Sequence, residues 1–73
     1  MVVLRRAMAR ICILGGGLVG RFVACTLLER NHDVRLVDGE NISNLPDKIE
    51  FIQTFINPHS VSELIIGFDV VVN

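Results

Sequence analysis

Apolar residues come in short runs that glycine-, asparagine- or proline-rich segments separate. The runs RICIL at 10–14 and DVVVN at 69–73 have apolar residues at successive positions, which is typical of strands covered on both faces of a parallel sheet. VRLVD at 34–38 predicts another strand, and this one ends in an acid. KIEFIQTFI at 48–56 mixes apolar with polar residues, which favours a strand at the edge of the sheet.

A helical repeat fills LVGRFVACTLLERN at 18–31, and NHD at 31–33 then makes a turn. Apolar residues recur at three- and four-residue steps, so one side of this helix should pack on the sheet. The residues expected on that side are Val19, Phe22, Val23, Thr26 and Leu27. Those expected to face water are Arg21, Glu29 and Arg30.

A second helix is predicted over NPHSVSELI at 57–65 from its capping residues. Asn57 can accept bonds from the first backbone amides, Pro58 suits the first helical position, and Gly67 can end the helix. The turn-rich stretch GENISNLPD at 39–47 carries no such signal. We therefore expect at most one short helical turn between the second and third strands.

Four strands that alternate with two helices predict an α/β fold, a Rossmann-like doubly wound parallel sheet with right-handed crossovers. The expected strand order is third, second, first, fourth, with the first strand at the centre. Residues 10–73 would form a partial dinucleotide-binding domain, truncated after the fourth strand, and residues 1–9 an unstructured or variable N-terminus. The fourth strand would be an apolar edge, so we expect the rest of a longer chain or a homo-oligomer partner to cover it.

Composition narrows the class of protein. The 73 residues are 51% hydrophobic and 21% charged, with a net charge of −1, which indicates a globular domain and no nucleic-acid or membrane partner. No apolar stretch reaches the roughly 18 residues of a membrane span, and we expect no export signal. Cys12 and Cys25 have no metal-site spacing to His32 or His59. We therefore expect no metal, and two buried, reduced thiols in a cytoplasmic protein.

The stretch ILGGGLVGR at 13–21 contains the spacing GxGxxG between a predicted strand and a predicted helix. Gly15 suits a tight turn, Gly17 lets the backbone approach a pyrophosphate, and Gly20 lets the helix pack against the first strand. The amides of Leu18 and Val19 would then point at the phosphates from the positive end of the helix dipole. The motif alone is weak, but its place between these two elements makes a cofactor loop the favoured interpretation.

Asp38 ends the second predicted strand, 18 residues after Gly20, where a dinucleotide-binding domain places its ribose-binding acid. Its carboxylate can accept bonds from the adenosine ribose hydroxyls and would repel a 2′-phosphate. Gly39 and Glu40 supply no arginine to offset that repulsion. The sequence therefore predicts NAD, with NADP less favoured. The alternative for Asp38 is a solvated acid at a strand end.

The stretches ICILGGGLVGRFVACTLLERNHDVRLVD and IEFIQTFINPHSVSELIIGFDVVVN resemble the N-terminal segment of the saccharopine dehydrogenase family. The resemblance implies a nicotinamide-dependent oxidoreductase that acts on an amino acid or a derivative of one, with catalytic residues in a later domain. Gly15, Gly17, Gly20 and Asp38 match the family's cofactor positions, and Asn73 matches the point where the family's chain runs on toward the nicotinamide. The 73 residues alone should then bind the cofactor weakly and turn over no substrate.

Two departures from that family bear on the cofactor pocket. Family members commonly have an aspartate near the end of the third strand, where this sequence has Phe55, so the adenine pocket should differ. The segment between the second and third strands is also short, which predicts that part of one sheet face is uncovered. We expect Arg35 on that face.

Two other functions share the glycine pattern. FAD-binding amino-acid oxidases also carry a glycine loop and a strand-end acid. The nucleotide-sensing modules of potassium-transport regulators do too, but they usually show a Gly-Asp-Ala/Thr run where this chain has FINPHS. Neither histidine is expected to be catalytic, because His32 lies in a turn at the edge opposite the strand ends and His59 in the first turn of a helix.

Overall fold

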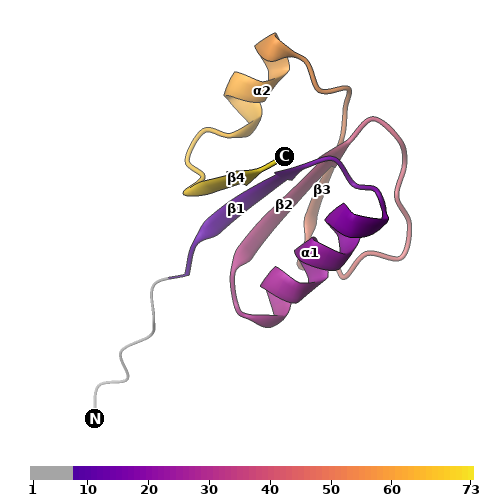
Figure 1. The fold of residues 1–73 in the computed structure, drawn as a ribbon, viewed down its shortest axis with the longest axis vertical. Helices are drawn as coiled ribbons and strands as arrows, with labels where there is room; N and C mark the ends of the chain where they lie inside the picture. Colours follow the sequence, from indigo (N-terminus) through magenta and orange to yellow (C-terminus); the bar gives the residue numbers. More distant parts are fainter. Residues whose placement is uncertain (1–7) are drawn as a thin grey trace.

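The computed structural model describes residues 8–73, which fold as a parallel sheet with two helices (Figure 1). The sheet has the strand order β3-β2-β1-β4, so the predicted α/β architecture and strand order are confirmed. The elements in chain order are β1 (Arg10–Leu14), α1 (Leu18–Glu29), β2 (Asp33–Asp38), β3 (Glu50–Gln53), α2 (Pro58–Leu64) and β4 (Val70–Val72).

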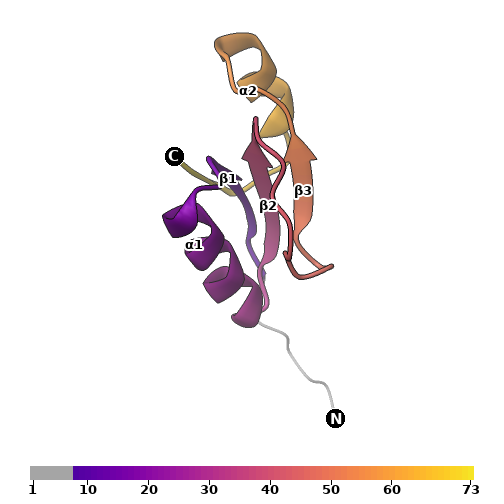
Figure 2. The same ribbon diagram turned by 90° about the vertical axis from the view of Figure 1, so that its right-hand side faces the viewer.

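Several elements are shorter than the sequence predicts. α1 ends at Glu29 because the chain reverses at Asn31, whose φ of 68° is left-handed. β3 comprises Glu50–Gln53 and not 48–56, because the chain leaves the sheet soon after the Thr54 amide bonds the Asp38 carbonyl at 2.9 Å. The carboxyl ends of β1, β2 and β3 therefore meet at one edge of the sheet (Figure 2).

The core lies between the sheet and α1. Its buried residues come from alternate positions of β1 and β2, from α1 and from the residue before β3: Ile11, Ile13, Ala24, Val34, Leu36 and Ile49. Burial of an aliphatic side chain of this size contributes about 1.5–3 kcal/mol. This small cluster is therefore the main source of stability that the described residues show.

The buried side of α1 matches the predicted one in part, because Val23 and Leu27 pack against the core. Val19 and Phe22, expected to face the sheet, are 74% and 72% exposed. Ala24 is the fully buried residue of the helix, and Gly20 lies so close to β1 that a Cβ there would overlap the Gly15 carbonyl oxygen. Gly20 and Ala24, one helical turn apart, thus make the closest approach to the sheet, and Val23 and Leu27 pack against the core beside them.

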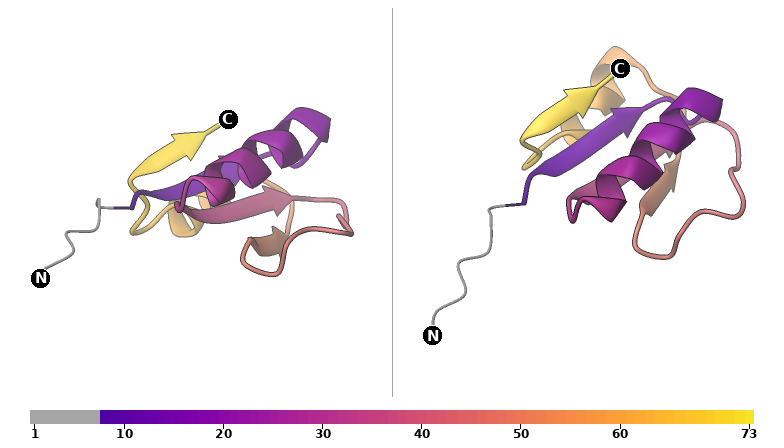
Figure 3. Two further views of the ribbon diagram at one scale, coloured as in Figure 1. Left: turned by 90° about the horizontal axis from the view of Figure 1, so that it is seen from below. Right: turned by 60° about the horizontal axis from the view of Figure 1, so that its bottom comes forward.

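α2 lies on the side of the sheet opposite α1, as Figure 3 shows. Alternate strand residues point to opposite faces, and Cys12 and Arg35 bond the Leu64 carbonyl at the end of α2, the Arg35 bond being 2.8 Å. The Arg35 guanidinium also bonds Glu50 at 2.8 Å and lies over the Phe68 ring. The prediction that Arg35 lies on an uncovered face is therefore wrong. Its side chain links the end of α2 to the sheet.

The segment between β2 and β3 contains no helix, as predicted. Its apolar residues cover the α1 side of the sheet instead, with Ile49 buried and Ile42 and Leu45 packed against the core cluster. The short segment thus supplies side chains where a longer one would supply a helix.

The two cysteines are free thiols in different surroundings. Cys12 is fully buried in β1, and burial raises the pKa of its thiol, an effect that Arg35 partly opposes. Cys25 is half-buried at the rim of the core, so the prediction of two buried thiols holds for Cys12 alone.

β4 is an apolar edge strand, as the sequence predicts. Val71 pairs with Cys12 of β1 in parallel register, and Val70 and Val71 remain 44% and 41% exposed. An exposed apolar edge offers unpaired backbone groups to another strand.

Candidate functional site: a cleft at the carboxyl ends of β1 and β2

The glycine loop turns the chain from β1 into α1. Gly15 has a φ of +110°, a conformation that side-chain-bearing residues rarely adopt, and its amide donates to the Val37 carbonyl at 2.8 Å. Because this bond ties the turn to β2, the loop is fixed from both strands.

Gly17 is the N-cap of α1 and provides no side chain to bond the first amides of the helix. The amides of Leu18 and Val19 lie in that first turn, where an α-helix offers them no acceptor of its own. The two side chains are 85% and 74% exposed. A Cβ added at Gly17 would meet no atom within 4 Å, so the chain itself does not require glycine at this position.

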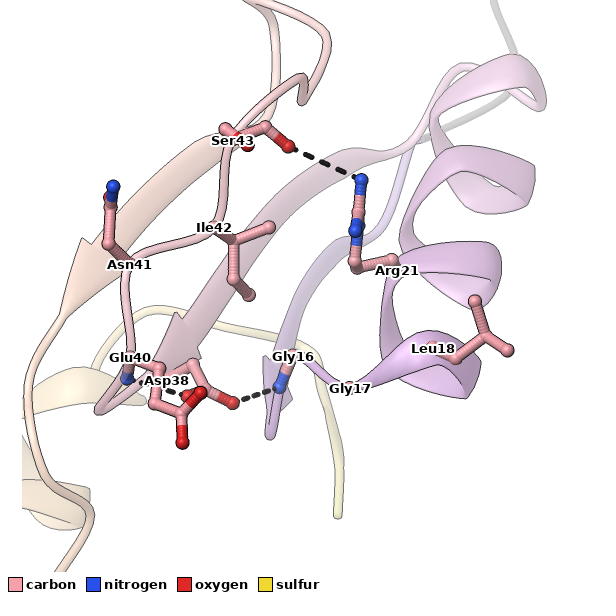
Figure 4. Close-up of a pocket in the computed structure, with 9 residues that line it drawn as sticks. All are labelled: Gly16, Gly17, Leu18, Arg21, Asp38, Glu40, Asn41, Ile42 and Ser43. Atoms are coloured by element: carbon pink, nitrogen blue, oxygen red, sulfur yellow. Dashed lines mark hydrogen bonds between the residues drawn. The ribbon is translucent and has the colours of Figure 1, made fainter.

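Asp38 is held against the glycine loop. Its Oδ2 accepts the Gly16 amide at 2.6 Å, and its Oδ1 accepts the Glu40 amide at 2.8 Å (Figure 4). These amides, Glu40 first and then Gly16, lower the pKa of the Asp38 carboxyl below its ordinary value, more than burial opposes this. Each carboxylate oxygen keeps a lone pair for a further donor.

Gly16, to which the motif assigns no role, has one here. It is buried, and a Cβ on it would overlap the Cδ1 of Ile42 and crowd the Cβ of Asp38. The absence of a side chain therefore lets the β2–β3 segment fold directly onto the glycine loop. The run of three consecutive glycines was the signal for this contact, but the motif explains only two of them.

Arg21 reaches across the same region from α1. Its Nη2 donates to the Ser43 carbonyl at 3.3 Å (Figure 4), and the residue is half-buried, whereas the sequence predicted that it faces water. Periodicity cannot show this link, because the carbonyl comes from a loop.

Together these residues line one cleft of about 460 Å³. The lining residues are Gly16, Gly17, Leu18, Arg21, Asp38, Glu40, Asn41, Ile42 and Ser43. Three predicted site residues line the cleft, Gly17, Leu18 and Asp38, and they come from the glycine loop, the start of α1 and the end of β2. The structure places Gly15 and Gly20 behind this surface, where they shape the turn.

Neither histidine lines this cleft. His32 accepts the Ala9 amide at 3.3 Å in a second hollow of about 630 Å³, which Lys48 also lines, at the opposite edge of the sheet. His59 donates its backbone amide to the Asn57 cap of α2.

Residues 8–73 contain no group of three or more His, Cys, Asp or Glu side chains that could hold a metal ion. No helix in the same range is long and apolar enough to cross a membrane.

Comparison with known proteins finds a partial similarity to a dehydrogenase. The chain is 46% identical over 37 residues to a KsdD-like steroid dehydrogenase from Mycolicibacterium smegmatis. The match covers 51% of this chain and 7% of that protein, so the chain corresponds to a small part of its relative's length. No model of a protein family matches the chain, and no solved structure matches it.

Proposed function

We propose that this chain binds the adenosine and pyrophosphate half of a dinucleotide cofactor, as part of an oxidoreductase. The observation that carries the proposal is the bond between the Asp38 carboxylate and the Gly16 amide, which brings the strand-end acid and the glycine turn into one cleft. Ligands of doubly wound sheets bind at the carboxyl ends of the strands. The match to a dehydrogenase supports the oxidoreductase class.

Each residue has a place in this proposal. The pyrophosphate would lie over Gly17, against the amides of Leu18 and Val19, where the helix dipole favours an anion. The ribose hydroxyls would donate to the remaining lone pairs of Asp38. Gly15 and Gly20 hold the turn and the helix in place.

We further propose NAD(H) as the cofactor. The amides of Gly16 and Glu40 keep Asp38 ionised, and an ionised carboxylate repels a 2′-phosphate. The resemblance to saccharopine dehydrogenases favours an amino acid or its derivative as the substrate of the whole enzyme, with the reaction carried out by residues outside this segment.

Calorimetric titration with NADH, NADPH and FAD tests the proposal. We expect weak binding of NADH, weaker binding of NADPH, and a greater loss for NADH than for NADPH in Asp38→Ala. Equal losses would assign Asp38 a purely structural role, and tighter binding of NADPH would contradict the cofactor. Binding of FAD in preference to both would favour a flavoprotein.

A further inference from the structure

Phe55 is a large aromatic side chain exposed beside the proposed ribose site. It lies two residues after the end of β3 and is 79% exposed, among the most exposed apolar residues of the described chain. It does not line the cleft around Asp38, so the proposed function leaves it unexplained.

The ring is positioned next to the ribose-binding acid. A Cβ built on Gly39 would come within 2.7 Å of a Phe55 ring carbon, so the ring rests on the residue that follows Asp38. The backbone here is fixed by two bonds: Thr54 donates its amide to the Asp38 carbonyl at 2.9 Å, and the Ser60 hydroxyl donates to the Phe55 carbonyl at 3.2 Å. The ring is thus held at the edge where the strands end.

Two polar side chains near Phe55 in the sequence, those of Gln53 and Asn57, make hydrogen bonds to the backbone. The side-chain Nε2 of Gln53 donates to the Gly39 carbonyl at 3.5 Å. The Oδ1 of Asn57 accepts the amides of His59 and Ser60 at 2.9 and 3.0 Å. The exposed Phe55 ring is therefore accessible to an adenine base at this edge.

We propose that Phe55 holds the base of the cofactor by stacking, and that this subsite tolerates a change in the base. Stacking on an aromatic ring depends little on base identity, because every base has a π-face. A hypoxanthine base, which lacks the 6-amino group of adenine, should then bind as well as adenine. This inference rests on the proposed dinucleotide function and adds to it the way in which the base is read.

The test is a titration with NADH and with its hypoxanthine analogue, reduced nicotinamide hypoxanthine dinucleotide. We expect the two to bind the 73-residue chain within about threefold of each other. Phe55→Ala should weaken both by about five- to hundredfold, the range that loss of one stacked base implies. Phe55→Trp should retain binding of both.

Ile66→Ala is the matched control, because Ile66 is a similarly exposed apolar residue, 72% exposed, close to the opposite edge of the sheet. It should leave both affinities unchanged. Unchanged binding in Phe55→Ala, or tenfold weaker binding of the hypoxanthine analogue to the wild-type chain, would overturn the stacking proposal. If Asp38→Ala still weakens NADH in that case, the proposed function stands, whereas a wild-type chain that binds neither dinucleotide refutes both.

Discussion

The Asp38 carboxylate joins three backbone segments: the end of β2, the glycine loop through Gly16, and the following loop through Glu40. Its pKa is lowered in the folded chain. A carboxyl group of this kind stabilises the fold above its unfolded pKa of about 4 and loses that contribution as the pH falls through the folded pKa. The contribution of Asp38 to the free energy of unfolding should therefore be lost at acid pH.

Asp38→Asn tests this coupling, because asparagine does not titrate and its amide nitrogen cannot accept a backbone bond. We expect the variant to have a lower free energy of unfolding than the wild type at pH 7. The difference should shrink as the pH falls below about 4, since the wild-type carboxyl then becomes protonated too. Urea unfolding at several pH values measures it, and a difference independent of pH would contradict the account.

At the scale of single residues, the sequence predicted where Asp38 lies in the fold. It did not predict which residues of the β2–β3 segment contact the glycine loop and α1. The spacing from Gly20 predicted an acid, Asp38, at the end of the second strand, where the structure has it, because that spacing follows from the lengths of one helix and one strand. Contacts that depend on how the β2–β3 segment folds, such as Ile42 on Gly16 and Arg21 on Ser43, leave no periodic signal. Sequence reasoning therefore missed both Gly16 and Arg21.

The elements themselves were predictable because their patterns are local, but the face of α1 that packs on the sheet was predicted only in part, with Val23 and Leu27 correct. Apolar residues surround most of this helix, so three- and four-residue steps fit more than one face. The close packing of Gly20 against the Gly15 carbonyl decides the face. Bulky residues such as Phe22 are then turned away from the sheet.

Gly20→Ala and Gly17→Ala form a matched pair that separates packing from binding. A Cβ at Gly20 overlaps the Gly15 carbonyl oxygen, whereas one at Gly17 meets no atom within 4 Å. We expect Gly20→Ala to lower the free energy of unfolding by about 1–3 kcal/mol, typical of overpacking. Gly17→Ala should change it by less than about 1 kcal/mol.

For Gly17→Ala we expect the main effect on NADH binding and not on stability. In Gly17→Ala the fold is kept, and NADH binding should be weakened because the methyl group occupies the approach of the pyrophosphate. Urea unfolding and calorimetric titration of both variants give the two quantities. A stable Gly17→Ala chain that binds NADH like the wild type would refute the proposed phosphate position.

For the whole molecule, the strand order was predictable because alternation of strands and helices and the right-handed crossover rule leave few topologies. The same order puts β4 at an edge with Val70 and Val71 exposed. We propose that another protein segment, such as a second copy of this chain, covers this edge.

Val71→Lys tests that prediction with the 73-residue chain. A lysine on an edge strand discourages pairing with another strand. We expect the wild type to self-associate as its concentration rises and Val71→Lys to remain monomeric, as measured by sedimentation velocity. Ile66→Lys, which places the same charge outside β4, should associate like the wild type. A wild-type chain that stays monomeric at the highest concentration would contradict self-association.

The central claim is that a dinucleotide binds where the glycine loop meets Asp38, and an NMR titration of the ¹⁵N-labelled chain with NADH tests it most directly. The account predicts progressive shifts of the backbone amides of Gly16, Gly17, Leu18 and Val19 and of the residues just after Asp38. Amides at the opposite edge, around His32, should not move. The absence of shifts in the glycine loop at millimolar NADH, or shifts centred on the His32 edge, would contradict the claim.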